Sequence, residues 1–546
     1  MVSFVSFLNN LFGKKEQTKP IISEQPSKIM EIYKDEKVSK HLPETLQKVK
    51  DVFGDDNDFC VRDIEIMEQI SSSIIFISSI SDIDIVSKEV IKPLLEMECS
   101  QNNGELQQRD LKSVIKKRVL FHADIMTENN ISNILSAILK GYAVLFVDGV
   151  DDAFLINTYK TEKRSISQPE TEQVIRGPRD GFIENLQSNI ALIRSRLPIP
   201  DFRVKSMEIG KLTKSTVVIC YIDGITNKAL VEEVENRLST IDIDRVLDAG
   251  YIEQFIQDNP RSPFPQIRST ERPDAVVGNL VEGRVAILVD GSPFVLLLPA
   301  TFNQFYQTPE DYNERFIMVS IIRFIRLIAL VFSLITPSLY VAIISYHPEL
   351  IPTAFAVAVT SGRAGVPFPA VVEVFLMEAA MEVLREATVR MPKQVGGALS
   401  IVGVLVIGQA AVSAGFVSPI TVVVIALTTI GSFATPSYNM AIGFRMLRFP
   451  LLFLTGILGF YGLMIGLLFV NNHVISLKSF GVPYLSPIAP VKFNGLKDTF
   501  IRGPLNWLLD RPAELQVTNQ RRLVPHESHP ASPLSSENND KKERRE

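Results

Sequence analysis

The feature that most constrains this chain is a long uncharged stretch, Gln394–Phe444, which contains no Asp, Glu, Lys or Arg. About twenty apolar residues are enough for a helix to cross the hydrocarbon core of a bilayer. The stretch is therefore long enough for two crossings. Its middle, Gly415–Pro419, combines residue types that end one helix and start another. We predict two transmembrane helices here, Val395–Phe416 and Val417–Thr435, joined by a tight turn.

Further membrane segments flank this hairpin. The uncharged run Leu327–Pro348 follows Arg323 and Arg326, which predicts one span with these arginines at its cytoplasmic end. Phe449–Val470 predicts the last span, and Pro436–Arg448 is expected to be the loop before it.

The segment Leu350–Val372 is ambiguous. Its apolar part is only about eleven residues long, which favours a re-entrant or interfacial piece over a simple span. If this segment does not cross the membrane, the chain has four spans, and if it does, the chain has five. The distribution of basic residues favours five. Arg363 interrupts the segment, and it lies either at membrane depth as a functional residue or in a loop outside the lipid.

The next segment, Val371–Arg390, predicts a helix with a charged stripe that contains Glu378, Glu382, Arg385 and Glu386. A solvated face is the simpler interpretation. In an oligomer, such a stripe can instead line an aqueous pore, because rings of carboxylates select cations.

Before residue 316 the chain has the mixed composition of a soluble region. Two apolar runs that end in Asp-Gly, Ala143–Gly149 and Ala286–Gly291, are each followed by another apolar run, which predicts β-hairpins. A third run, Val217–Gly224, precedes apolar residues at helical spacing and predicts a strand–helix unit. An Asp at a strand end can bind metal or phosphate, but a plain turn is the favoured interpretation.

The amphipathic helix Ile183–Leu197 is expected to connect two subdomains. The predicted fold is therefore an α/β soluble N-terminal region of two subdomains plus an α-helical transmembrane domain of four or five spans. The expected parts are a tail or linker at 1–40, α/β subdomain 1 at 41–161, a connecting helix region at 162–206, α/β subdomain 2 at 207–315, the transmembrane domain at 316–475 and a polar C-terminal tail at 476–546.

Several classes of function are disfavoured. The sequence has no phosphate-binding loop, H-E-x-x-H, G-x-S-x-G or G-x-G-x-x-G motif, so we expect no catalytic residues, no metal site and no cofactor. A net charge of −5 and the absence of a basic stripe argue against nucleic-acid binding. Three scattered cysteines favour a reducing compartment. Arg176 and Arg179 precede a helix and are candidates for anion binding or for a salt-bridged subdomain interface, of which the interface is favoured.

Four stretches together give the chain a specific resemblance to a known family. It resembles the A subunits of GerA-type spore germinant receptors, with Thr388 where the family is expected to have Gly. The stretches are Arg176–Phe182 with Glu184–Leu186 and Ala191–Arg196, Pro367–Pro369 with Glu373, Leu384–Pro392, and Pro436–Tyr438 with Arg445–Phe449.

The resemblance implies a non-enzymatic, multi-pass protein of the inner spore membrane, with its N-terminal region in the cytoplasm, which is the spore core. It implies a transporter-like B subunit, expected to bind the nutrient, and a lipoprotein C subunit as partners. It also implies a homo-oligomer in which this subunit forms the ion path.

The candidate pore-lining or gating residues are Arg363, Glu373, Glu378 and Glu382. Two alternatives remain. The first is a secondary transporter of a small nutrient, which broken segments such as Ser361–Pro369 would suit. The second is a membrane-anchored enzyme, for which the sequence offers no convergent polar pocket.

Overall fold

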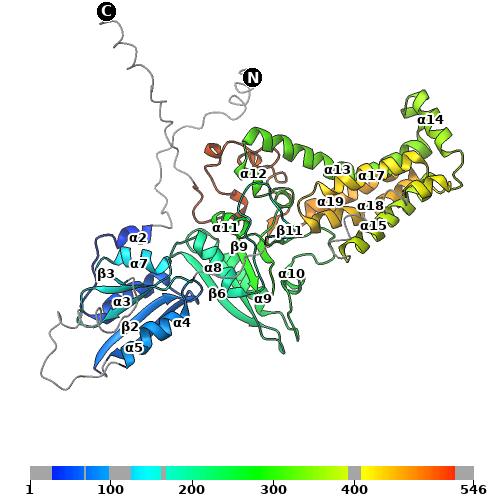
Figure 1. Cartoon of the computed structure of the whole chain (residues 1–546). Coiled ribbons are helices and arrows are strands. Elements are labelled where there is room, and N and C mark those ends of the chain that lie inside the picture. Colours follow the sequence, from blue (N-terminus) through cyan, green and yellow to red (C-terminus); the bar gives the residue numbers. More distant parts are fainter. Residues whose placement is uncertain (1–27, 67–68, 97–124, 161–167, 391–407, 523–546) are drawn as a thin grey trace, which may run out of the picture.

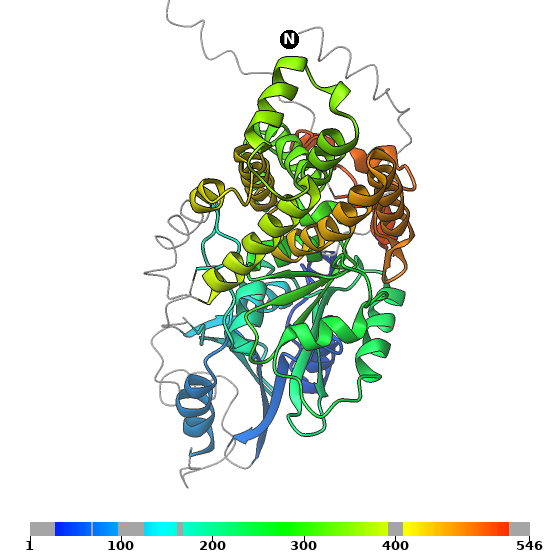
Figure 2. The ribbon, with the colours of Figure 1, turned by 90° about the vertical axis from the view of Figure 1, so that its right-hand side faces the viewer.

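The structure is a computed structural model that describes residues 28–66, 69–96, 125–160, 168–390 and 408–522. Figure 1 shows two α/β units followed by an arm of helices that extends to one side, and Figure 2 looks along this arm and shows its helices bundled together. Most of the predicted tail 1–40, the first half of the predicted helix Val395–Phe416 and residues 523–546 lie outside the described residues.

The first unit is a five-stranded antiparallel sheet with strand order β1-β2-β4-β5-β3. The predicted hairpin is confirmed, since β4 pairs with β5 and Val144 lies opposite Leu155. The elements of this unit are α3 (Leu42–Phe53), β1 (Phe59–Ile66), β2 (Ile70–Ile77), α4 (Ile83–Ile85), the π-helix η1 (Val86–Ile91), α5 (Lys92–Leu95), β3 (Ile125–Glu128), α7 (Ile131–Leu139), β4 (Tyr142–Val147) and β5 (Ala153–Asn157).

The second unit repeats the first. Its antiparallel sheet has the order β6-β7-β9-β10-β8, which is the same order once its strands are counted from β6. The second predicted hairpin, β9–β10, and the predicted strand–helix unit, β7–α9, are both confirmed. The elements are α8 (Leu186–Arg196), β6 (Phe202–Ile209), β7 (Ser215–Ile222), α9 (Lys228–Ser239), α10 (Ala249–Ile256), β8 (Arg268–Thr270), α11 (Pro273–Val281), β9 (Val285–Val289) and β10 (Val295–Leu298).

The two Asp-Gly turns have the same structural role in both units. The Asp148 carboxylate accepts a hydrogen bond from the Leu42 backbone N–H at the start of α3, at 3.0 Å. The Asp290 carboxylate accepts one from the Leu186 N–H at the start of α8, at 3.4 Å. The first N–H groups of a helix have no acceptor within the helix. Each Asp-Gly turn therefore supplies a hydrogen-bond acceptor to one N–H at the start of the helix. The favoured interpretation, a turn, agrees with these contacts.

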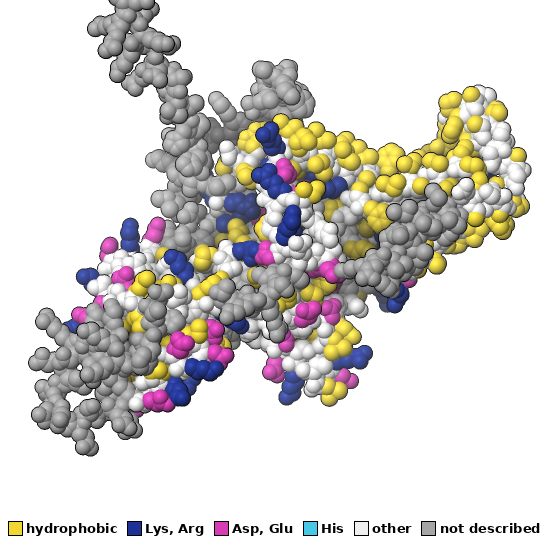
Figure 3. Space-filling view, in the orientation of Figure 1, with side chains coloured by type: hydrophobic (Ala, Val, Ile, Leu, Met, Phe, Trp, Pro, Cys, Tyr) yellow, Lys and Arg dark blue, Asp and Glu magenta, His cyan; other side chains and the backbone are white. Residues whose placement is uncertain are grey.

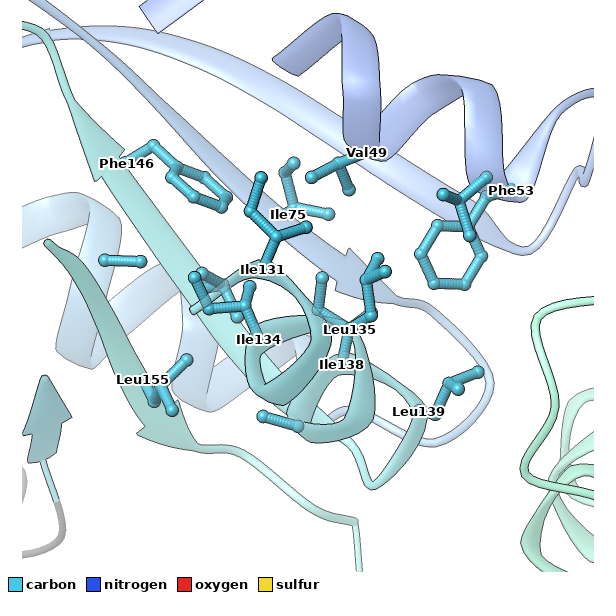
Figure 4. Packing of buried hydrophobic residues seen from close by; sticks show 14 of the residues in the cluster. Val49, Phe53, Ile75, Ile131, Ile134, Leu135, Ile138, Leu139, Phe146 and Leu155 are labelled. Atoms are coloured by element: carbon cyan, nitrogen blue, oxygen red, sulfur yellow. The ribbon is translucent and has the colours of Figure 1, made fainter. Parts of the chain in front are cut away.

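Helices cover both faces of each sheet. In the first unit, Val49 and Phe53 of α3 and Ile131 and Leu135 of α7 pack on one face against strand residues such as Ile75 (Figure 4). The opposite face is covered by η1 and α5. In the second unit, α8 and α11 cover one face and α9 and α10 the other.

The region expected to connect the subdomains, 162–206, is tied to the second unit. The apolar side of α8 belongs to the core of the second sheet, and β6 pairs with β7. The two units meet where Arg194 of α8 reaches Asp56 and Asp58 of the first unit.

The helical arm consists of residues 316–390 and 408–476 among those described. Its helices are α13 (Phe316–Tyr346), α14 (Thr353–Arg363), α15 (Ala370–Val389), α17 (Pro419–Phe433), α18 (Tyr438–Leu458) and α19 (Phe460–Ser476). Within the described residues, α13 and α18 are long and apolar enough to cross a membrane, and α17 and α19 are apolar but shorter. The count of four or five spans therefore stays a prediction.

Two expectations about the arm were wrong. Pro436–Arg448 is not a loop: the Ser437 side chain caps the start of α18, and its arginines lie inside the bundle. The predicted last span is broken at Gly459, whose φ of +59° lets the chain turn back into α19.

Arg323, expected at the cytoplasmic end of the first span, lies near the start of α13. It is buried, and it binds Asp311 at 2.7 Å and Asp498 at 2.8 Å. Burial alone would raise the pKa of Asp311, but Arg323 and Arg326 hold it below its ordinary value.

Residues 477–522, within the expected polar tail, form what we call the C-terminal strap. Its Leu515 and Val517 belong to the core of the second unit. Its Asp498 binds Arg323 at the start of the arm. The strap therefore ties the last helix back to both the second sheet and α13. Its short elements are β11 (Lys478–Ser479), β12 (Val482–Pro483), α20 (Phe493–Leu496), η5 (Leu505–Trp507) and η6 (Ala513–Leu515).

Candidate functional site

The helical arm has polar residues inside and large apolar residues outside. Phe433 and Phe469 are 69% and 70% exposed, whereas Glu373, Glu378 and Arg448 are buried. Figure 3 shows many hydrophobic side chains on the visible surface of the arm. Large exposed apolar patches mark surfaces that contact a membrane or another protein.

The innermost charged group is Glu373 of α15, whose side chain is 0% exposed. One carboxylate oxygen accepts a hydrogen bond from Arg363 Nε at 3.0 Å and forms an ion pair with Arg363 Nη2 at 2.9 Å. The other accepts from the Ser418 backbone N–H and the Thr421 hydroxyl, both at 3.0 Å. Ser418 is the N-cap of α17, so the carboxylate lies at the positive end of that helix.

This carboxylate joins four helices. Arg363 ends α14, Glu373 lies on α15 and Thr421 on α17, and the Tyr340 hydroxyl of α13 lies 3.1 Å from Thr421 Oγ1. Glu373 is thus fully bonded, and the break between α14 and α15 is held against the bundle.

The second pair is Glu378 and Arg448. Arg448 Nη1 lies 3.2 Å from Glu378 Oε2, and both side chains are at most 3% exposed. Among the described residues, Glu378 Oε1 and Arg448 Nε and Nη2 have no hydrogen-bond partner. The pair therefore has buried hydrogen-bonding atoms that lack partners among the described residues.

The third group lies one turn further along α15. Glu382 binds Arg385 at 2.6 Å and lies 3.3 Å from Arg445 of α18. The next acid, Glu386, is exposed and binds the exposed Arg390 at 2.7 Å. The predicted stripe therefore divides into a buried acid, Glu378, and a partly exposed acid, Glu382, that both face arginines of α18, and one acid on the surface, Glu386.

Glu378 and Glu382 lie on the side of α15 that faces α18, whereas Glu373 lies on the side that contacts Arg363 of α14 and the start of α17. Arg363 and Glu382 are partly exposed, at 21% and 27% of their side chains. We call these four candidate pore or gating residues, which follow one another from the end of α14 along α15, the charged line. A paired carboxylate does not attract cations as a bare one does, so ion binding at this line requires the arginines to move or the pairs to open. Within the described residues there is no group of three or more His, Cys, Asp or Glu side chains that could hold a metal ion.

Arg176 and Arg179 lie apart from this line. Arg176 is exposed and lies 3.5 Å from Glu314, and its backbone N–H donates to Glu310 at 3.2 Å. Arg179 is exposed. The anion-binding and interface roles of Arg176 and Arg179 both stay predictions.

Sequence reasoning missed the residue that joins the soluble region to the arm. Phe264, in the loop before β8, is buried against Phe444 of α18 and lies near His473 of α19. Ser262 Oγ lies 2.9 Å from His473 Nε2. The sequence feature that could have indicated this contact is a phenylalanine between two prolines, Pro263 and Pro265, in an otherwise polar loop.

Comparison with known proteins gives a consistent result. Residues 47–514 match the family described as Bacillus/Clostridium GerA spore germination protein. Spore germination protein KA of Bacillus subtilis (strain 168) is 42% identical over 501 residues, which covers 91% of this chain and 91% of that protein. The uncharacterized membrane protein YfkQ of the same organism is 39% identical over 527 residues, or 96% of this chain and 100% of that protein.

Among solved structures, the N-terminal domain of the A subunit of the Bacillus megaterium spore germinant receptor GerK3 is similar in sequence to about half of the chain. It is 32% identical, covers 49% of this chain and 97% of that chain, and superposes with a TM-score of 0.38. On the extent of the family match, the chain belongs to the GerA family of spore germination proteins.

Proposed function

We propose that this chain is a membrane subunit of a nutrient germinant receptor that triggers spore germination. The observation that carries the proposal is the inverted polarity of the helical arm, in which charge pairs are buried and large apolar side chains are exposed. Membership of a spore germination family supplies the biological setting. We place the arm in the inner membrane of the spore, crossing it four or five times, with the two α/β units in the spore core.

In this proposal the chain oligomerises and forms a ligand-gated cation channel with a transporter-like B subunit and a lipoprotein C subunit. The line of Arg363, Glu373, Glu378 and Glu382 forms or gates the ion path. Buried ion pairs are costly to form in lipid and are commonly kept for function. Opening the incompletely bonded Glu378–Arg448 pair would expose a carboxylate to passing cations.

Potassium release from spores tests the proposal. Spores carrying Glu378→Gln or Glu382→Gln are exposed to the cognate nutrient, and release is compared with Glu386→Gln, an exposed glutamate on the same helix. We expect slower or spontaneous release from the first two variants and ordinary release from the third. Unaltered release from Glu378→Gln and Glu382→Gln spores that hold normal amounts of all three subunits would remove this line from the ion path.

A secondary transporter of a small nutrient is the second candidate. The break between α14 and α15, held by the Arg363–Glu373 pair, resembles the discontinuous helices at transporter binding sites. Concentrative uptake of labelled nutrient into vesicles that contain the purified receptor would favour the transporter. Current across a planar bilayer without such uptake favours the channel.

A further inference from the structure

A cavity with a polar wall lies outside the helical arm, between the second unit and the C-terminal strap. Its volume is about 660 Å³, within the range of sites for small ligands. One wall is α11, another is the segment that leads from β10 into α13, and the third is the strap. Part of the wall is buried and polar, with Asn279, Asn303 and Gln304 each at most 8% exposed.

The wall carries excess positive charge. Seven Lys or Arg side chains and five Asp or Glu side chains line it. Two of those carboxylates already face arginines outside the lining: Asp274 binds Arg272 at 2.7 Å and Asp498 binds Arg323 at 2.8 Å. One lining arginine, Arg268, likewise lies 3.7 Å from Glu172 outside the lining. With these pairs set aside, lining cations still outnumber lining carboxylates.

One of these cations is fixed in place without a carboxylate. Arg511 is 8% exposed, and its Nε donates to the Val281 carbonyl at 2.7 Å. Its Nη1 donates to the carbonyls of Asn519 and Arg521, at 3.0 and 2.7 Å. Among the described residues, no carboxylate lies within ion-pair distance of it. Burial and the neighbouring Arg522 lower the pKa of Arg511, and Glu282 opposes this shift only in part.

We propose that this cavity binds a small anion that carries a phosphate or carboxylate group, with Arg511 as its main ligand. Three carbonyls hold the guanidinium, so Nη2 remains to donate to the anion with little loss of side-chain freedom. Arg522, which binds Glu282 at 3.2 Å, lies beside it on the same wall. Trp507 and Tyr312 also line the cavity and would contact an apolar or ring portion of the ligand.

The anion could be a soluble metabolite or a lipid headgroup, because the cavity lies close to the start of α13. The Arg502 backbone N–H of the strap donates to Ser320 Oγ at 3.1 Å, and the apolar side chains of Phe316 and Ile317 are exposed nearby on the same helix. The site does not depend on the proposed ion path, since none of its residues lies on the charged line along α15.

Trp507 makes the test direct, because it is the only tryptophan in the chain. The full-length chain in detergent is titrated with inorganic phosphate, and chloride at equal ionic strength is the control. We expect a saturable change in tryptophan emission. Arg511→Gln should weaken phosphate binding at least about tenfold, as for loss of a charge-assisted hydrogen bond in a buried site. Arg245→Gln, at an exposed arginine of the second unit, should bind like the original chain.

A second variant keeps the test decisive if Arg511→Gln does not fold. Arg522→Gln leaves the three carbonyl contacts of Arg511 in place and should weaken binding several-fold. Nanodiscs separate the two sources: a phosphate-dependent change in phosphatidylcholine discs indicates a soluble anion, and a change seen only with phosphatidylglycerol discs indicates a headgroup. The proposal would be overturned if neither inorganic phosphate nor phosphatidylglycerol changed the tryptophan emission. It would also be overturned if Arg511→Gln and Arg522→Gln both bound with the affinity of the original chain.

Discussion

The Phe264 ring packs edge-on against the Phe444 ring, with centroids 5.5 Å apart and planes at 78°. Phe264 belongs to the second α/β unit and Phe444 to α18 of the helical arm, so this contact joins the two regions. Edge-to-face pairs of this kind add about 0.5–1.5 kcal/mol beyond the apolar area that they bury. The Phe264 ring is buried, so truncating it would leave a cavity at this contact.

Phe264→Ala should therefore weaken both stability and coupling. We expect the loss to be about 3–5 kcal/mol, the range for truncating a buried aromatic side chain. In spores, the response to nutrient should slow while the amount of receptor stays within a few-fold of normal. Thermal unfolding of the purified chain and the germination rate measure the two effects. Phe255→Ala, at an exposed phenylalanine of α10, is the control and should change neither.

The sheets were predictable because their signals are local. Asp-Gly turns between apolar runs predicted both β-hairpins, since a tight turn needs a residue that tolerates positive φ, and Gly149 and Gly291 supply it. The repeat of strand order between the two units was not predictable, because it depends on pairing between strands that are distant in the chain, such as β5 with β3.

The arm was predictable only in outline. Charge-free runs indicate lipid, but charged residues inside a bundle look like loops in a sequence, which is why Arg445 and Arg448 were placed in one. The strap was missed for a similar reason. Its composition is polar and proline-rich, and its order comes from long-range contacts such as that of Asp498 with Arg323 rather than from periodicity.

The Glu378–Arg448 pair allows a double-mutant cycle. Glu378→Leu leaves a buried guanidinium without its carboxylate, which should destabilise the detergent-solubilised chain by about 3–5 kcal/mol. Arg448→Leu should have a similar effect. The double variant should be more stable than either single variant, because both uncompensated charges are gone. The thermal unfolding midpoints decide the result, and additive losses in the double variant would show that the two side chains are not coupled.

Arg194 should control how firmly the two α/β units are held together. Its guanidinium lies 2.8 Å from Asp56 and 2.9 Å from Asp58, and all three side chains are at most 2% exposed. Arg194→Gln leaves two buried carboxylates and should cost about 3–5 kcal/mol at neutral pH. The loss should shrink in acid, where protonation removes the negative charges. Unfolding midpoints at pH 7.5 and pH 5 measure this. Arg62→Gln, at an exposed arginine of the first unit, is the control and should leave the midpoint unchanged at both pH values.

Asp201 gives a testable pH dependence outside the arm. Burial raises the pKa of its carboxyl to about 6, with Arg203 opposing and Asp223 adding to the rise. Among the described residues, its Oδ2 is buried without a hydrogen-bond partner. The folded state therefore holds a proton more tightly than the unfolded state, where the pKa is 3.8.

Stability from this group is fully present below about pH 4 and is lost as the pH rises to about 6. Asp201→Asn removes the buried charge, so it should stabilise the chain by about 1–3 kcal/mol at pH 7.5 and by much less at pH 4. Unfolding midpoints across this range test it. Asp223→Asn, at a side chain that is 40% exposed, should leave most of the change of stability with pH in place. If Asp201→Asn is no more stable at pH 7.5 than the original chain, the carboxyl is not the group that limits stability at neutral pH.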